Sequence, residues 1–99
     1  MGTEILEEVF SVIRDRKENP RSDSYVSSLF ERGEEQILSK VKEESYELLK
    51  AVQDEGDSEV VHESADVIFH IMVLLAKEGL ELEDVMEELR KRRKPREVE

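Results

Sequence analysis

The chain has 99 residues, of which 37% are hydrophobic and 41% charged, and its formal net charge is −11. This length suits one domain with a thin core, and the acidic balance argues against general nucleic-acid binding, because the surface would repel a phosphate backbone. Without Cys there is no disulfide framework or thiolate zinc site, and no apolar stretch is long enough for a bilayer, so we expect a cytoplasmic protein that binds neither nucleic acid nor membrane.

The N-terminal part of the chain predicts two helices separated by a loop. The first covers residues 3–17, with Thr3 as its N-cap, because apolar residues recur there at helical spacing: Ile5, Leu6, Val9, Phe10 and Ile13. Asn19-Pro20 ends it, since the residue before proline is pushed out of the α region. A polar loop over residues 21–24 precedes a short helix over residues 25–31, which ends at Gly33.

Two long helices and a final one follow. The first long helix is predicted over residues 34–54 and is broken by Gly56 and Asp57. The second begins at Ser58, its predicted N-cap, and runs to about residue 78, with Gly79 just beyond its end. A last helix begins near Leu82. No strand pattern is present, so the chain predicts an all-α domain over residues 1–94 with a disordered tail at 95–99.

The helix over residues 34–54 carries acidic residues where packing would favour apolar ones. Its apolar stripe is predicted as Ile37, Val41, Leu48 and Val52. Glu44 lies on this stripe, between Val41 and Leu48. Glu47 lies one turn further along the same side, and Glu43 can join them.

The next helix shows the same feature more sharply. Residues 65–76 are nearly all apolar, which predicts burial on most sides, and only Asp66 and His70 interrupt them. Glu63 lies one turn before Asp66 on the same face. His70 is interpreted either as a structural hydrogen-bonding residue of the core or as a residue that hydrogen-bonds a carboxylate or the substrate. His62 is expected to face solvent.

The two acidic pairs are expected to meet. Helices joined by a short turn usually pack antiparallel, and Glu47 and Glu63 each lie eight residues from Glu55 in the turn. Carboxylates facing one another in a partly buried site repel, and Mg²⁺, which prefers oxygen ligands, would remove that repulsion. The alternative is a solvated acidic face, or a salt-bridge network with Lys40, Lys42 or Lys50.

The order Glu-x-x-Glu, spacer, Glu-x-x-Asp resembles the all-α nucleotide pyrophosphohydrolases, the superfamily of the MazG proteins. It is most similar to the phosphoribosyl-ATP pyrophosphohydrolase family of histidine biosynthesis. The matching segments cover almost the whole chain: Ser24-Tyr25, Ser28-Leu29-Phe30, Gly33, residues 40–47, residues 63–70, residues 73–76, Gly79-Leu80, Leu82, Asp84-Val85 and Glu88-Leu89. Lys42 and Ser45 depart from the usual Gly and Ala, but neither removes a carboxylate.

This resemblance implies a fold, a reaction and site residues. The fold is a MazG-like bundle of about five helices around a long antiparallel hairpin, completed as a homodimer. The reaction is Mg²⁺-dependent hydrolysis of phosphoribosyl-ATP to phosphoribosyl-AMP and pyrophosphate. The implied metal ligands are Glu44, Glu47, Glu63 and Asp66, with Glu43 or Glu44 accepting the proton of the attacking water.

Further residues are implied as contacts of the small-molecule nucleotide substrate. Lys40 is the first candidate for a phosphate contact, and the weaker ones are Ser24, Tyr25, His70, Arg92 and Arg93. The two arginines also suit a helix C-terminus electrostatically. Two other functions stay open: a house-cleaning pyrophosphohydrolase acting on dUTP or aberrant nucleoside triphosphates, and a non-enzymatic acidic interaction module.

Overall fold

The computed structural model describes residues 2–93, and within them the chain is all helical. Its helices are α1 (Glu4–Glu18), α2 (Tyr25–Arg32), α3 (Glu34–Asp54), α4 (Asp57–Lys77) and α5 (Leu82–Lys91). The fold class and all five predicted helices are therefore confirmed. The tail over residues 95–99, predicted to be disordered, lies outside the described residues. No helix in the described part of the chain is long and apolar enough to cross a membrane.

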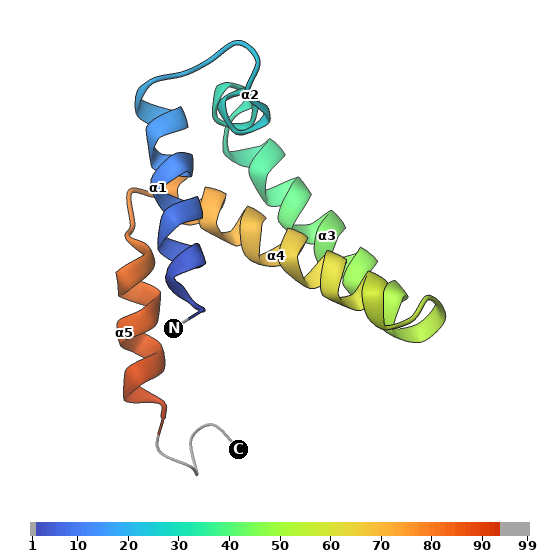
Figure 1. The fold of residues 1–99 in the computed structure, drawn as a ribbon. Coiled ribbons are helices and arrows are strands. Elements are labelled where there is room, and N and C mark those ends of the chain that lie inside the picture. Colours follow the sequence, from blue (N-terminus) through green and yellow to red (C-terminus); the bar gives the residue numbers. More distant parts are fainter. Residues whose placement is uncertain (1, 94–99) are drawn as a thin grey trace.

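The dominant feature is an antiparallel hairpin of α3 and α4, which forms one arm of the molecule (Figure 1). The other arm contains α1 and α5, and α2 lies at the junction. Gly33 connects α2 directly to α3, because it ends one helix and precedes the other with a φ of +99°. This left-handed conformation is open to glycine at little cost, so the chain can turn sharply there without a linker.

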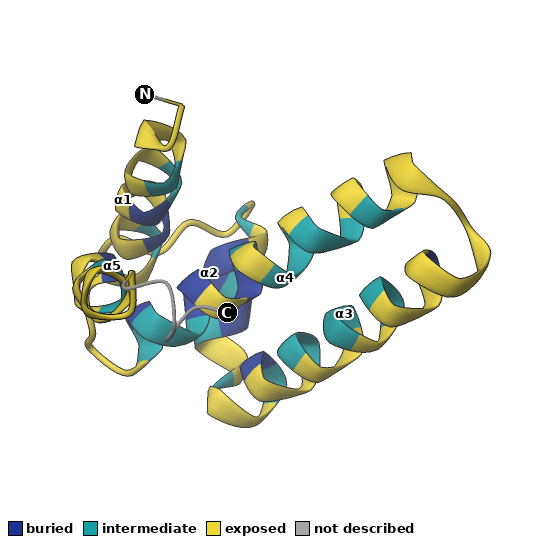
Figure 2. Ribbon diagram, turned by 90° about the horizontal axis from the view of Figure 1, so that it is seen from below, coloured by how far each residue is buried: buried dark blue, intermediate teal, exposed yellow. Residues whose placement is uncertain are grey.

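The core lies at the junction of the two arms, where the buried residues gather (Figure 2). Each helix contributes to it: Phe10 and Ile13 from α1, Val26 and Leu29 from α2, Ile37 from α3, Met72, Val73 and Ala76 from α4, and Leu82 from α5. The hairpin therefore projects from the core with its acidic motifs outside the most densely packed region.

Three details of the prediction are wrong. Ser58 is not the N-cap of α4, because Gly56, two residues earlier, takes that position and the helix begins at Asp57. Val52 is 63% exposed, and the adjacent Ala51 is buried in its place, since one residue along a helix turns the side chain by about 100°. The segment 65–76 is not buried on most sides: Ala65, Ile68 and Ile71 are exposed, because α4 packs against neighbours on only part of its circumference.

Candidate active site

The acidic site is centred on one turn of α4. Ligand atoms of His62, Glu63 and Asp66 all lie within 4.8 Å of one another. The Nε2 atom of His62 is 3.4 Å from Oδ2 of Asp66. His62 is exposed, as expected, yet its ring reaches the cluster. Sequence reasoning missed this contact, although the four-residue spacing of His62 and Asp66 places both on one helix face.

Glu63 links the cluster to α3. Its pKa is raised above the usual value by burial, and also by the neighbouring carboxylates of Asp66 and Glu44. Its Oε1 atom is shielded from solvent and accepts no hydrogen bond from the described residues. A buried carboxylate oxygen without a donor costs free energy. A divalent cation would satisfy that oxygen and offset the repulsion, so the donor set fits a metal bound by oxygen.

Lys40 lies beside the α3 carboxylates of the site. Its ammonium group is 3.1 Å from Oε1 of Glu43 and 3.5 Å from Oε2 of Glu44. The hydrogen bond to Glu43, ahead of other charges, raises the pKa of Lys40. Part of the alternative salt-bridge network is therefore present. This network does not include Glu63. Within residues 2–93, neither Lys40, Lys42 nor Lys50 forms an ion pair with Glu63.

Glu47 is less closely tied to the other carboxylates. It is half-buried on α3, one turn beyond Glu44. Within the described residues its side chain makes no hydrogen bond or ion pair. The structure therefore brings Glu44, Glu63 and Asp66 together, while the role of Glu47 as a ligand stays a prediction.

A hydrogen-bonded chain connects α2 to the cluster. The Oη atom of Tyr25 is 2.9 Å from Nε2 of the buried His70, whose Nδ1 is 2.8 Å from the backbone carbonyl of Asp66. A carbonyl only accepts, so Nδ1 carries the proton, and Nε2 of the neutral ring accepts from Tyr25. Burial raises the pKa of Tyr25, and its charged neighbours include Lys40, Glu44 and Asp66. Tyr25 thus lies beside the acidic cluster.

The other predicted substrate contacts lie elsewhere. The hydroxyl of Ser24 caps α2 by accepting from the backbone N–H of Ser27. Arg92 pairs with Glu88 at 3.0 Å on α5, and Arg93 follows at the end of the described chain. Helix α5 lies beside α1, away from the hairpin (Figure 1). No hydrogen bond or ion pair joins either arginine to the acidic cluster in the described part of the chain.

Comparison with known proteins identifies consistent relatives. The family model described as phosphoribosyl-ATP pyrophosphohydrolase matches residues 6–93. A phosphoribosyl-ATP pyrophosphatase of Haloarcula marismortui is 45% identical, over 91% of this chain and 94% of the relative. The protein of the same description from Methanococcoides burtonii is 46% identical, over 90% and 92%. That of Clostridium novyi is 43% identical, over 92% and 83%.

Proposed function

The chain belongs to the phosphoribosyl-ATP pyrophosphohydrolase family, and we propose that its α3–α4 cluster holds the Mg²⁺ ion used in that reaction. The activity is hydrolysis of phosphoribosyl-ATP to phosphoribosyl-AMP and pyrophosphate, a step of histidine biosynthesis. A pyrophosphohydrolase of this kind works with a divalent metal, and Mg²⁺ is our choice among these. The supporting observation is the buried Oε1 of Glu63, which has no donor among residues 2–93, while the carboxylates of Asp66 and Glu44 raise the pKa of Glu63.

The proposed ligands are Glu44, Glu47, Glu63 and Asp66. When bound, Mg²⁺ would neutralise phosphate oxygens and help to position a water molecule for attack. Without a cation, the carboxylates on α3 and α4 would repel a polyphosphate. His62 is placed to hold the side chain of Asp66 from outside the ligand set, through their 3.4 Å contact.

The remaining steps fall to side chains of α2 and α3. Either Glu43 or Glu44 accepts the proton of the attacking water, and both are paired to Lys40. As phosphate charge arrives, Lys40 can turn its ammonium group from these carboxylates to a phosphate oxygen. Tyr25 donates its hydrogen bond to His70, so its hydroxyl oxygen can still accept a hydrogen bond from the substrate or a water molecule. Positioning and electrostatics therefore account for the catalysis.

Two substitutions test the metal site. Glu44→Gln and Asp66→Asn each keep the side-chain shape but remove a negative charge, so we expect both to abolish pyrophosphate release. Thermal unfolding with and without Mg²⁺ provides a second readout: the ion should raise the melting temperature of wild type, and less so that of the variants. Glu35→Gln, an exposed position on α3, is the matched control and should behave as wild type.

The same assay separates the related activities. Phosphoribosyl-ATP, dUTP and common dNTPs are supplied side by side, and we expect turnover of phosphoribosyl-ATP. Turnover of dNTPs alone would contradict the proposed substrate. If Mg²⁺ produced neither a thermal shift nor turnover, the metal site would be rejected.

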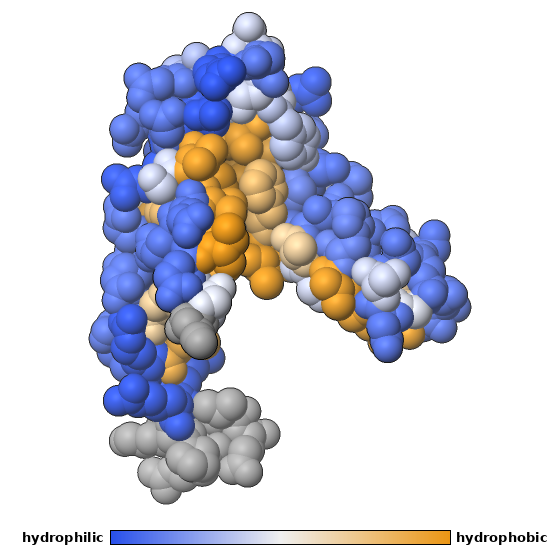
Figure 3. Space-filling model, viewed as in Figure 1, coloured by the Kyte–Doolittle hydropathy of each residue, from blue (hydrophilic) through white to orange (hydrophobic). Residues whose placement is uncertain are grey.

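The active form is proposed to be a homodimer. Exposed apolar side chains form stripes on both hairpin helices: Leu38, Leu49 and Val52 on α3, and Val61, Ile68 and Ile71 on α4. Apolar surface also lines the concave side between the two arms (Figure 3). An apolar patch of this extent is unusual on a monomer, and a second copy of the hairpin would cover it.

A further inference from the structure

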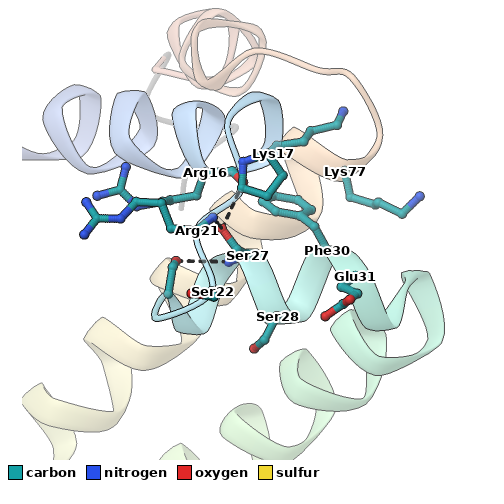
Figure 4. Close-up of a pocket in the computed structure, with 11 residues that line it drawn as sticks. Arg16, Lys17, Arg21, Ser22, Ser27, Ser28, Phe30, Glu31 and Lys77 are labelled. Carbon is teal, nitrogen blue, oxygen red and sulfur yellow. Dashed lines mark hydrogen bonds between the residues drawn. The ribbon is translucent and has the colours of Figure 1, made fainter.

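A basic pocket lies at the start of α2, and no residue of the acidic cluster lines it. It has a volume of about 650 Å³ and is formed where the C-terminal turns of α1 and α4 meet the loop before α2 and α2 itself. Arg16, Lys17, Arg21 and Lys77 line it. Figure 4 shows the two arginines on one side of the pocket and the two lysines on the other, with the Phe30 ring between them.

The charge of this pocket is opposite to that of the chain as a whole. The formal net charge is −11, yet four cations line the pocket against one carboxylate, that of Glu31. Positive charge gathered in a concave site attracts an anionic ligand more strongly than the same charges spread over a surface. The pocket is therefore suited to an anion despite the acidic character of the protein.

The cations keep most of their hydrogen-bonding capacity for a ligand. Among residues 2–93, Arg16 and Arg21 pair only with aspartates one and two residues away, Asp15 and Asp23, and exposed pairs of this kind contribute little. Lys77 forms no ion pair or hydrogen bond within the described residues. The Lys17 ammonium donates one hydrogen bond to a backbone carbonyl of α4 and has two donors left.

The uncharged lining fits a sugar phosphate better than a bare ion. Phe30 offers an apolar face against which a ribose can pack, and the carboxylate of Glu31 can accept from ribose hydroxyls. Arginine guanidinium groups match the geometry of phosphate oxygens with paired N–H donors. A few polar groups around an apolar wall are typical of small-molecule sites.

The pocket and the acidic cluster are both approached by the first turn of α2. Ser24 lines the pocket, while the next residue, Tyr25, reaches the cluster through His70. Successive residues at the start of α2 thus contact a phosphate-type site and the neighbourhood of a metal-type site.

This arrangement matches the two anionic ends of the substrate. Phosphoribosyl-ATP carries a triphosphate at one end and a ribosyl phosphate at the other. Resting on the proposed function, which places the triphosphate at the acidic cluster, we infer that the basic pocket binds the phosphate of the phosphoribosyl group. The pocket then distinguishes this substrate from ordinary nucleoside triphosphates, which lack the second phosphate.

The test uses a double variant, Arg21→Gln with Lys77→Gln. Neither side chain belongs to the core, and within residues 2–93 neither makes a hydrogen bond or ion pair with the acidic cluster. The KM for phosphoribosyl-ATP should rise by about tenfold or more, because charged contacts to phosphate are lost, while kcat stays near the wild-type value. The charge-matched control is Lys50→Gln with Lys91→Gln, which removes two cations outside the pocket and should leave KM unchanged.

A binding measurement keeps the inference testable apart from turnover. Ribose 5-phosphate is titrated into the isotope-labelled wild-type protein, and amide shifts should concentrate over residues 16–31. The shifts should be lost in the pocket variant and kept in the control. An unchanged KM in the pocket variant, or shifts spread equally in both variants, would overturn the inference. If wild type fails to hydrolyse phosphoribosyl-ATP but shows the pocket shifts, the proposed function fails and the phosphate pocket stands.

Discussion

At the scale of single residues, Glu63 has the least favourable environment of the carboxylates in the acidic cluster. Its buried Oε1 has no donor in the described part of the chain, and burial together with two neighbouring carboxylates raises its pKa above 4.5. Such a group is retained at a cost to stability, as residues of functional sites often are. Because the pKa of Glu63 is shifted, this cost to the free energy of unfolding depends on pH and can be measured in the metal-free protein.

Glu63→Gln should therefore stabilise the metal-free protein at neutral pH. Because the folded pKa is raised, folding favours the protonated carboxyl, and stability is lost as the pH rises from 4.5 through the folded pKa. Melting temperatures of wild type and variant in a chelator should agree near pH 4 and diverge towards pH 8, with the variant higher. A pH-independent difference would contradict this explanation.

Tyr25 is a second residue whose contact can be tested directly. Its hydroxyl is hydrogen-bonded to Nε2 of His70, and the His70 residue is only 5% exposed. Tyr25→Phe leaves that ring nitrogen without a partner, so we expect a loss of about 1 kcal/mol in the free energy of unfolding. Tyr46→Phe is the control, because Tyr46 is 65% exposed and makes no hydrogen bond in the described chain.

Urea denaturation followed by circular dichroism provides the comparison. Equal stabilities of the two Phe variants would mean that the link between α2 and α4 contributes nothing. A loss confined to Tyr25→Phe would support Tyr25 as a residue that fixes α2 against the turn bearing Asp66.

At the scale of helices, the sequence predicts best where glycine or proline interrupts a periodic pattern. The bounds of α3 agree with the prediction because Gly33 and Gly56 flank it. The start of α4 was misplaced because both Gly56 and Ser58 are acceptable caps, and only the path of the turn selects between them. The exposure of Val52 could not be predicted either, since it depends on how closely α3 approaches α4 at Ala51.

The C-terminal end of α4 allows a prediction at this scale. The backbone N–H of Leu80 bonds to the carbonyl of Leu75, and that of Gly79 to Ala76, which forms a Schellman motif. Gly79 has a φ of +77° and open space around its α-carbon. Gly79→Ala should thus cost about 1 kcal/mol from backbone strain alone.

Gly79→Asn provides the comparison, because asparagine tolerates this conformation better than alanine. Thermal unfolding of the three proteins should give the order Gly, Asn, Ala from most to least stable. If Ala equals Gly, the turn after α4 does not require a left-handed residue.

At the scale of the whole molecule, the parts of the site differed in how far they could be predicted. The acidic cluster comes from two helices joined by a short turn, so counting residues from Glu55 was enough to expect the two acidic pairs to meet. The count set Glu47 opposite Glu63, whereas Glu44 is the α3 carboxylate that acts on Glu63, because the count fixes only the level along the hairpin and not which side of α3 faces α4. The basic pocket draws its lining from four separated segments. No periodicity joins Arg16, Arg21 and Lys77 along the chain, so only the tertiary fold brings them together.

Assembly is the last property that belongs to this scale. Ile68 is 47% exposed on α4 and lines an apolar groove of about 350 Å³ with α1. If a second copy covers the hairpin, Ile68→Lys places a charge in that interface, and desolvating an unpaired charge there disfavours association. Leu89→Lys adds the same charge at an exposed apolar site on α5 and is the control.

Sedimentation equilibrium should give a dimer for wild type and the control, and a helical monomer for Ile68→Lys. A wild-type protein that sediments as a monomer across the concentration range would refute the dimer, and the apolar stripes would then need another partner.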